Sequence, residues 1–234
     1  MPFYTLFDPK YWLLVGPTMA LAAWASWRVK STFNKYSNVG VRSGMTGAEA
    51  AAAVCRQGAS PNVRIERIGG FLSDHYDPRA KTLRLSPEVF DGRSISAVAV
   101  AAHEAGHAIQ DEQNYSMLTM RSKLVPVTKI GSNLWMWVFM AGMFLSMKPL
   151  VNVGILLFAA VVLFQLVTLP VEFDASNRAK AVLSQSGIVS SEDERDGVSK
   201  VLGAAALTYV AGALTAIAQL AYFIMLANRR DGER

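Results

Sequence analysis

The sequence predicts a mainly α-helical integral membrane protein, with about four transmembrane helices and a small α+β domain that contains a short β-sheet. Hydrophobic residues make up 52% of the 234 residues, which is a high share for a soluble protein. Asp, Glu, Lys and Arg are absent from four windows, at 11–27, 130–147, 149–171 and 201–228. Each window is about as long as a helix must be to cross the hydrocarbon core of a bilayer. The charged residues gather between these windows, in segments that we therefore expect to lie outside the bilayer.

Residues 1–28 are predicted to hold the first transmembrane helix. A cleaved signal peptide is the alternative, because Lys10 precedes the apolar run and several alanines near its end could form a cleavage site. The residues before Lys10 carry almost no positive charge, however, and Trp24 and Trp27 are typical of a retained helix that ends at the membrane interface. We therefore expect this helix to remain in the protein.

The polar segment 29–129 is predicted to begin with a helix and a small sheet. Thr46 and Glu49 have the spacing of a capping box, which indicates the start of an alanine-rich helix that ends near Gly58. The single cysteine, Cys55, excludes an intrachain disulfide and is interpreted as inert packing in this helix. Three strands are expected next, at 63–68, 71–76 and 82–85. A sheet that precedes the next helix in this way offers an edge to which an extended peptide can bind.

The stretch His103-Glu104-Ala105-Gly106-His107 has the H-E-x-x-H pattern of zinc peptidases. Ser94 is a suitable N-cap for a helix that continues to Gln110, and the alanines and valines between them favour a buried helix. On that helix, His103 and His107 lie about 40° apart around the axis, so both imidazoles can bind one Zn²⁺ ion. Glu104 lies beside the first histidine, where its carboxylate can reach a water molecule on the metal without being a ligand.

The alternative interpretation of this pattern is a helix whose two histidines bind only backbone groups or solvent. The chain has three histidines, and two of them complete the pattern. Buried histidines need polar partners, and a metal ion satisfies both at once. We therefore expect a metal site.

The segment 130–170 is predicted to form a transmembrane hairpin, with Lys148 and Pro149 at its turn. Such a hairpin returns the chain to the face of the membrane that carries His103. Residues 171–200 are expected to follow as a helix and an acidic turn.

Glu172 is predicted to be the third protein ligand of the metal. Pro170 is expected to start a new helix, which places Glu172 in its first turn, directly outside the bilayer. Asp174 lies about 200° away around that helix, so only one of the two carboxylates can face the metal. The hairpin favours Glu172, because it emerges where the histidines lie. The alternative is that Glu172 only complements the positive end of the helix.

Residues 201–228 are predicted to form the last transmembrane helix. Lysines and arginines near the helix ends concentrate in the segments 28–129 and 172–200, which places these segments and the metal site on the cytoplasmic side of a multi-pass protein in the cell membrane. Arg229 and Arg230 favour the opposite orientation. The net charge of +5 suits an anionic membrane surface, and no nucleic acid is expected as a partner.

The sequence Asp74-His75-Tyr76-Asp77-Pro78 is a polar cluster between two predicted strands. One interpretation makes His75 or Tyr76 a hydrogen-bond donor to the oxyanion that forms when a peptide bond is attacked. The other is a turn stabilised by Asp74 and Asp77, with His75 at its surface. The residues alone favour the turn and leave both interpretations open.

Four stretches resemble, in order along the chain, the bacterial membrane-bound neutral zinc metallopeptidases of the YugP type. They are 74–78 (DHYDP), 100–110 (VAAHEAGHAIQ), 168–179 (TLPVEFDASNRA) and 205–210 (AALTYV), within a resemblance that covers about residues 44–226. It implies a zincin-like catalytic domain with a gluzincin-like site, in which His103, His107 and Glu172 bind Zn²⁺ and Glu104 is the base. The chain is more distantly similar to HtpX-type membrane peptidases, which usually have an aspartate four residues beyond the ligand glutamate. Here that position is Ser176.

These features predict a zinc-dependent membrane endopeptidase that acts on a peptide or protein substrate, with Glu104 as general base. Tyr209 and Arg178 are weaker candidates for stabilising the oxyanion. One alternative is a non-catalytic, zinc-stabilised membrane scaffold or adaptor, against which Glu104 counts, because a closed structural site needs no glutamate beside its first ligand. Another is a transporter or channel, against which the lack of ionisable residues in the four windows counts. The sequence favours no particular oligomeric state.

Overall fold

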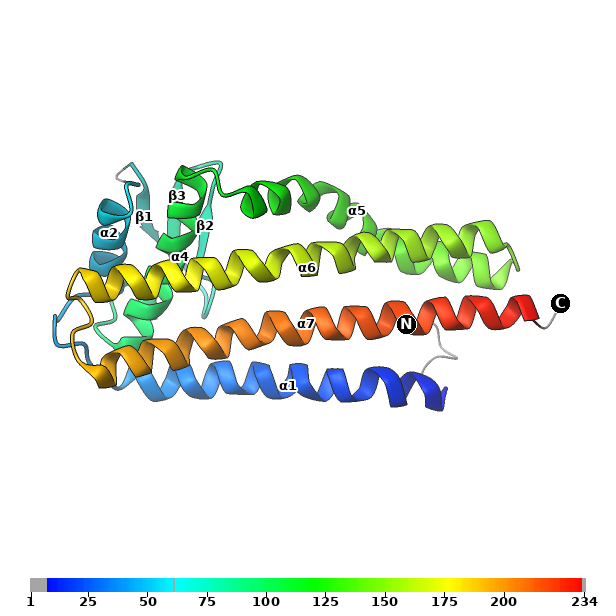
Figure 1. Cartoon of the computed structure of the whole chain (residues 1–234), viewed down its shortest axis with the longest axis horizontal. Helices are drawn as coiled ribbons and strands as arrows, with labels where there is room; N and C mark the ends of the chain where they lie inside the picture. The colour runs from blue at the N-terminus through cyan, green and yellow to red at the C-terminus, as the bar shows by residue number, and fades with distance from the viewer. Residues whose placement is uncertain (1–7, 61, 233–234) are drawn as a thin grey trace. The chain divides into compact units, whose positions relative to one another are not determined.

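A computed structural model describes residues 8–60 and 62–232. The elements follow one another in the order α1 (Pro9–Ser37), α2 (Gly47–Gln57), β1 (Arg64–Arg67), β2 (His75–Asp77), β3 (Thr82–Leu85), α3 (Pro87–Phe90), α4 (Ile95–Glu112), α5 (Ser116–Phe144), α6 (Lys148–Gln185) and α7 (Glu192–Gly232) (Figure 1). The described chain is mainly helical and contains one small sheet of three strands. The prediction of a mainly α-helical protein with a short sheet is therefore confirmed.

The chain divides into two compact units. The mixed unit consists of Ser26–Thr119 and Pro170–Leu207, and it contains the sheet together with α2, α3 and α4. The helical unit consists of the described parts of Met1–Ala25, Met120–Leu169 and Thr208–Arg234. The long helices α1, α5, α6 and α7 each contribute to both units.

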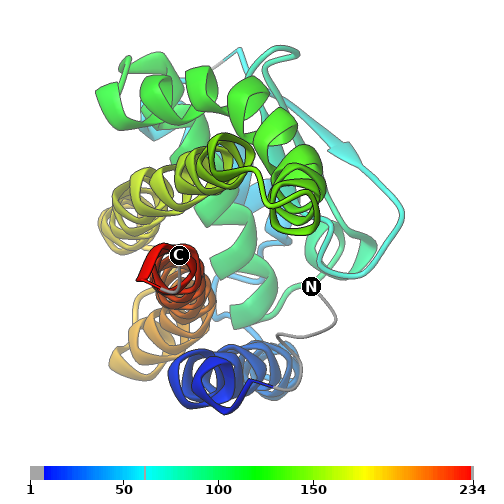
Figure 2. The ribbon, with the colours of Figure 1, turned by 90° about the vertical axis from the view of Figure 1, so that its right-hand side faces the viewer.

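The helical unit has an aromatic core. Within it, α1 and α7 run side by side (Figure 2), and the ring of Tyr11 packs edge-on against Tyr222 with the centroids 5.0 Å apart. Phe139 of α5, Phe158 of α6 and Phe223 of α7 are buried at the same core. Offset and edge-on aromatic pairs of this kind stabilise helix packing beyond their buried area.

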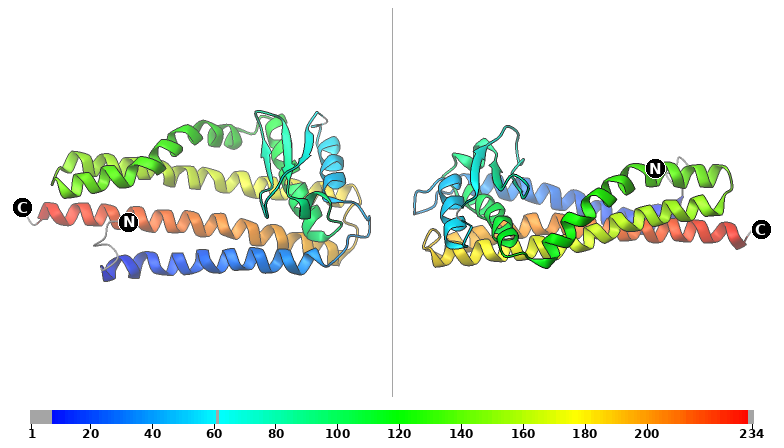
Figure 3. Two further views of the ribbon diagram at one scale, coloured as in Figure 1. Left: turned by 180° about the vertical axis from the view of Figure 1, so that it is seen from behind. Right: turned by 90° about the horizontal axis from the view of Figure 1, so that it is seen from above.

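The sheet of the mixed unit has the strand order β1-β3-β2, with β1 parallel and β2 antiparallel to β3 (Figure 3). Leu83 and Leu85 of the central strand are fully buried, which anchors the sheet to the core. The second strand is shorter than the predicted 71–76, because the chain turns first, with positive φ at Gly70 and Leu72. A backbone in that left-handed region cannot continue a strand.

Two helices of the mixed unit begin as their sequences predict. At α2, the N–H of Glu49 donates to Thr46 Oγ1 over 3.1 Å, and the N–H of Thr46 donates to Glu49 Oε2 over 2.7 Å, which completes the capping box. At α4, Ser94 Oγ accepts a hydrogen bond from the N–H of Ala97. The small residues of α2 allow it to pack closely on α4, with Ala51 and Val54 fully buried.

The helix α6 differs from its prediction at Pro170. No new helix starts there, because α6 runs without interruption from Lys148 to Gln185 with Pro170 inside it. Proline removes one N–H from a helix, but packing can hold the helix together, and both Val167 and Val171 beside it are buried. Glu172 therefore lies deep inside a long helix, and the alternative that it complements a helix N-terminus is wrong.

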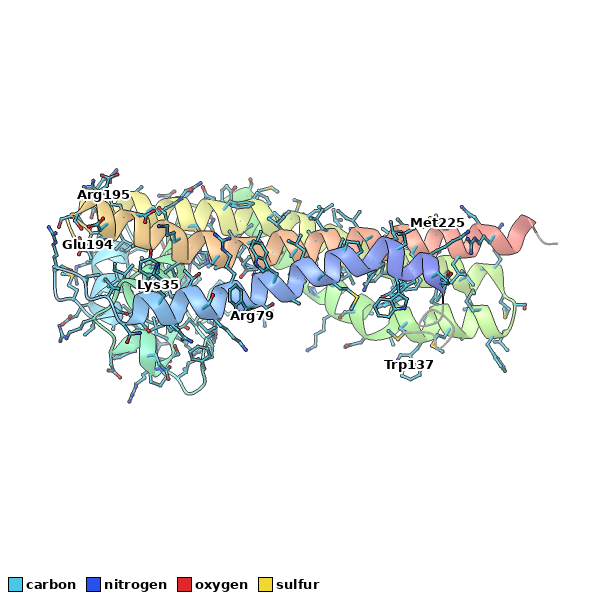
Figure 4. All side chains as sticks on the ribbon, turned by 90° about the horizontal axis from the view of Figure 1, so that it is seen from below. Lys35, Arg79, Trp137, Glu194, Arg195 and Met225 are labelled. Carbon is cyan, nitrogen blue, oxygen red and sulfur yellow. The ribbon has the colours of Figure 1, made fainter. Side chains whose placement is uncertain are left out.

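Two of the described helices, α6 and α7, are long and apolar enough to cross a membrane, rather than the four expected. The shorter apolar runs of α1 and α5 do not meet the same criterion. Proline, glycine and the amphipathic rings of tryptophan lower the hydropathy of both, as at Pro17 and Trp24 in α1. Side chains on α5 are nevertheless strongly apolar and exposed. Trp137, which is 72% exposed, projects away from that helix (Figure 4).

Candidate metal centre

Three predicted ligands come together within the mixed unit. His103 and His107 project from one face of α4, and Glu172 reaches them from α6. Glu172 Oε2 lies 3.2 Å from His103 Nε2 and 3.6 Å from His107 Nε2. Ligand atoms on a tetrahedral Zn²⁺ ion, each about 2.1 Å from the metal, lie roughly 3.4 Å from one another. Two imidazole nitrogens and a carboxylate oxygen at these separations therefore fit zinc in both spacing and chemistry.

A close contact between helices sets this geometry. Gly106, between the two histidines, faces the backbone of Ala175 on α6, where a side chain would not fit. Val171, Ala175 and Ala179 form a fully buried stripe on the same helix. Gly106 and Ala175 let α6 approach α4 closely enough for Glu172 to reach both imidazoles.

Burial and charge favour a cation at this point. Burial opposes the charge of Glu172, but hydrogen bonds from His103 and His107 prevail and hold the pKa of the carboxyl below its usual range. Burial also lowers the pKa of His107, but the hydrogen bond to Glu172 and the charge of Glu104 outweigh it, so the pKa of His107 lies above its usual value. The buried carboxylate of Glu172 thus attracts positive charge, which a divalent cation can supply in place of a proton.

Each histidine has a second partner at Nδ1. His103 Nδ1 lies 3.1 Å from Ser176 Oγ, and His107 Nδ1 lies 3.0 Å from Gln110 Oε1. These contacts leave Nε2 of both rings directed at Glu172. Sequence reasoning missed Gln110, although its place three residues after His107 puts it on the same face of the helix. Ser176 lies one turn beyond Glu172 on α6.

Glu104 is 9% exposed, and no described group donates a hydrogen bond to its carboxylate. Its charge contributes to the raised pKa values of two neighbours. The pKa of Asp74 is raised by burial first and by Glu104 in addition, and that of His107 is raised in part by Glu104. A buried carboxylate beside the metal ligands, without a donor among the described residues, is suited to hold a water molecule or take up a proton.

The other predicted site residues of the mixed unit have protein partners. His75 is exposed on β2, and its Nδ1 lies 2.8 Å from the carbonyl oxygen of Ser73. Tyr76 donates from its hydroxyl to Asp111 Oδ2 over 2.7 Å, which ties β2 to α4. The guanidinium of Arg178 binds Asp174 and Gln113.

Two further residues weighed from the sequence, Asp174 and Tyr209, are not among the three ligands. Asp174 accepts a hydrogen bond from Gln110 and does not belong to the group of three that could hold a metal. Tyr209 lies on α7 in the helical unit, whereas the three ligands lie in the mixed unit. Its part in stabilising an oxyanion stays a prediction.

Comparison with known proteins identifies the family. The family described as "Putative neutral zinc metallopeptidase" matches residues 11–228. The chain belongs to this family. It is also 47% identical over 214 residues to the "Putative membrane protease YugP" of Bacillus subtilis (strain 168), covering 91% of this chain and 95% of that protein. No solved structure matches the chain.

Membership in the neutral zinc metallopeptidases agrees with the residues brought together here. Zn²⁺ is the cofactor of the family, and His103, His107 and Glu172 form a group that could hold it. The relative is named as a membrane protease, and two helices of this chain are apolar enough to cross a bilayer. The resemblance stated from the sequence is therefore confirmed.

Proposed function

We propose that this neutral zinc metallopeptidase is a membrane endopeptidase with its metal held by His103, His107 and Glu172 and with Glu104 as general base. The observation that carries the proposal is the meeting of three ligand atoms from α4 and α6 beside a buried carboxylate that has no donor among the described residues. A structural zinc site would need the three ligands but not that carboxylate.

The chemistry follows from these groups. Zinc, when bound, lowers the pKa of water toward neutrality and polarises the carbonyl of the scissile bond. Glu104 accepts the proton of the attacking water at its carboxylate and passes it to the nitrogen of the leaving amine. Ser176 and Gln110 hold the two imidazoles from behind.

The sheet offers a place for the substrate backbone. β2 pairs with β3 on one side and is an edge of the described sheet. It also contacts α4, the helix that carries the histidines. An extended peptide can add to such an edge through backbone hydrogen bonds, independently of its side chains. This favours a peptide or unfolded protein segment as substrate.

The candidate residues for donating a hydrogen bond to the oxyanion differ in whether their donor groups are already engaged. His75 lies on this edge strand, but Nδ1 must donate to the carbonyl of Ser73, since a carbonyl only accepts. Nε2 of neutral His75 is then an acceptor, so His75 can stabilise an oxyanion only when protonated. Arg178 is engaged with Asp174, and Tyr209 is kept as the further candidate.

The chain is proposed to cross the cell membrane several times, with the mixed unit in the cytoplasm. The aromatic and methionine-rich runs of α1 and α5 would join α6 and α7 in the bilayer. Large exposed apolar side chains on α1, α5 and α6 support this, such as Leu13 at 80%, Phe144 at 89% and Leu156 at 70%. Lysines and arginines at the helix ends of the mixed unit support the cytoplasmic side.

The decisive experiment compares Glu104→Gln with the wild type. The variant keeps every ligand, so we expect it to bind zinc normally and to lose at least about 10²-fold in peptide cleavage. Glu88→Gln makes the same change at an exposed position of α3 and should retain full activity. N-terminal proteomics of cells with each protein would identify the substrates.

Activity in purified Glu104→Gln equal to that of the wild type, or cleavage that chelators do not affect, would overturn the peptidase proposal. The non-catalytic scaffold predicts equal proteomes for the two proteins and a phenotype only when zinc binding is lost.

A further inference from the structure

Gln110 is a fully buried amide placed one turn beyond His107 on α4. Its Oε1 lies 3.0 Å from His107 Nδ1. Its Nε2 donates to the carbonyl oxygen of Val171 over 2.8 Å and to Asp174 Oδ2 over 2.7 Å. Both ends of the amide are thus engaged, one with a metal ligand and the other with α6.

The partners of Gln110 determine which way its amide points. The carbonyl of Val171 and the carboxylate of Asp174 only accept hydrogen bonds, so both must face the NH₂ group. The amide oxygen is then the atom that meets His107. Because that oxygen only accepts, His107 Nδ1 must carry a proton, and the lone pair of the neutral ring lies on Nε2, on the side of Glu172.

Asp174 is itself held in place. The guanidinium of Arg178 binds the same carboxylate oxygen as Gln110 does, and it also reaches Gln113 at the end of α4. The ring of Tyr115 lies 5.7 Å from this guanidinium. A continuous set of polar contacts therefore leads from the end of α4 to the back of His107.

We propose that Gln110 is a positioning residue of the metal site, which presets His107 with Nε2 as the ligand atom, and that Asp174 and Arg178 act through it. His103 is constrained less, because a serine hydroxyl such as that of Ser176 can donate as well as accept. This inference rests on the proposed zinc site, and it assigns to Asp174 and Arg178 a supporting role in that site.

Two substitutions at Gln110 separate positioning from packing. Gln110→Met has nearly the same shape but no polar atoms. Gln110→Glu keeps an oxygen toward His107 Nδ1, in either protonation state, but loses the NH₂ group that Asp174 and Val171 need. Zinc affinity is measured by chelator competition on the full-length protein in detergent, and thermal unfolding is measured on the metal-free protein. Gln185→Met, at an exposed position of α6, is the matched control.

Zinc affinity and thermal stability should respond differently to the two substitutions. We expect both variants to unfold at lower temperature than the wild type. Zinc affinity should fall about 10- to 100-fold in Gln110→Met and stay within a few-fold of the wild type in Gln110→Glu. The visible spectrum of the Co²⁺ form should change in the first variant and be retained in the second. Gln185→Met should change neither readout.

An unchanged zinc affinity in Gln110→Met, or an equal loss in both variants that follows their stability, would overturn the proposal. Where Gln110→Met does not fold, Asp174→Asn replaces it. This variant keeps the size of the side chain but can donate to the Gln110 amide oxygen. We expect zinc to bind several-fold more weakly, and unchanged binding would contradict the proposal. These readouts concern zinc binding and stability and do not involve cleavage, so they remain valid even if Glu104→Gln shows that no peptide is cleaved.

Discussion

Gly106 of α4 faces the backbone of Ala175 on α6 so closely that a Cβ atom at Gly106 would lie 2.5 Å from the carbonyl oxygen of Ala175. This glycine lies between the two histidine ligands of α4. Ala175 lies close to Glu172 and Ser176 on α6. The absence of a side chain at Gly106 is therefore what lets the two halves of the metal site meet.

Gly106→Ala should push α4 and α6 apart, because the clash is with backbone and not with a flexible side chain. Overpacking typically costs about 1–3 kcal/mol, which exceeds the gain of up to about 1 kcal/mol from replacing a helical glycine. We expect a lower unfolding temperature and weaker zinc binding. Gly203→Ala on α7 has open space around it and should be neutral or stabilising. Equal behaviour of the two variants would show that the close approach is not needed.

Glu172→Gln should weaken zinc binding more than any change at a residue behind the ligands, for which about 10- to 100-fold is typical. The substitution keeps the shape of the side chain but removes the charge that holds the cation. His75→Gln changes an exposed residue of β2 and should retain its zinc. The measurement is zinc content after dialysis against a mild chelator. Retention by Glu172→Gln together with loss by His75→Gln would refute the ligand assignment.

Ser176→Ala should bind zinc more weakly, because it removes the hydroxyl behind His103 Nδ1. Ser176→Asp puts a stronger acceptor there, and we expect its affinity to equal or exceed that of the wild type. Ser184→Ala, at an exposed position farther along α6, is the control and should have no effect. Competition with a chromogenic chelator measures all three. If Ser176→Ala bound zinc as tightly as the control, Ser176 would have no part in orienting His103.

Cysteine accessibility in intact cells should place the mixed unit in the cytoplasm. Cys55 is 3% exposed and buried in α2, so it adds little background. Cysteines at the exposed positions Ser43 and Gln57 should react with an impermeant reagent only after the cells are opened. A cysteine at Ser146, in the turn between α5 and α6, should react in intact cells. The reverse labelling pattern would place the site on the outer side.

Glu194, in the first turns of α7 (Figure 4), should make the protein less stable in acid. It is 4% exposed. Burial opposes its charge, but hydrogen bonds from the backbone N–H groups of Arg42, Ser191 and Ser190 lower the pKa of this carboxyl from 4.5 to about 2. Since the folded pKa is depressed, its stabilisation is complete above about pH 4.5 and is lost as the pH falls toward 2.

Glu194→Gln should therefore lower the free energy of unfolding at neutral pH by about 1–3 kcal/mol, because an NH₂ group replaces one of the two oxygens that accept hydrogen bonds from backbone N–H groups. Its stability should also change less between pH 4.5 and 2 than that of the wild type. Glu192→Gln alters a side chain that is 94% exposed in the same turn and should leave both unchanged. Thermal unfolding over this pH range tests the prediction, and identical pH profiles for Glu194→Gln and the wild type would contradict it.

Local signals in the sequence were sufficient for much of this structure. The capping box at Thr46 and the N-cap at Ser94 act within one helical turn, so they determine where α2 and α4 begin without help from the rest of the chain. The four-residue spacing of His103 and His107 likewise fixes their common face, because helical periodicity alone places them there. Two imidazoles on one face predict the metal, and Glu104 beside them predicts the reaction class.

Other features depended on residues that meet only after folding. The proline signal at Pro170 pointed to a helix start, but packing on both sides keeps α6 continuous. The sequence predicts an acidic turn within 171–200, but it does not predict that Glu194 is buried or that it accepts a hydrogen bond from the N–H of Arg42, which is 152 residues away along the chain. No local pattern contains such a partner.

The sequence by itself determined that the two histidines share one helix face, that Glu104 lies beside the first of them, and that the apolar segments are helical. Each of these features depends on the spacing of residues within one helix. The contact between Gly106 and Ala175 decided how closely α6 approaches α4. At that distance Glu172 meets the imidazoles and Asp174 meets Gln110. The physical reason is that ligand distances of a few ångströms are set by how two helices pack, and that packing depends on side chains about 70 residues apart in the chain.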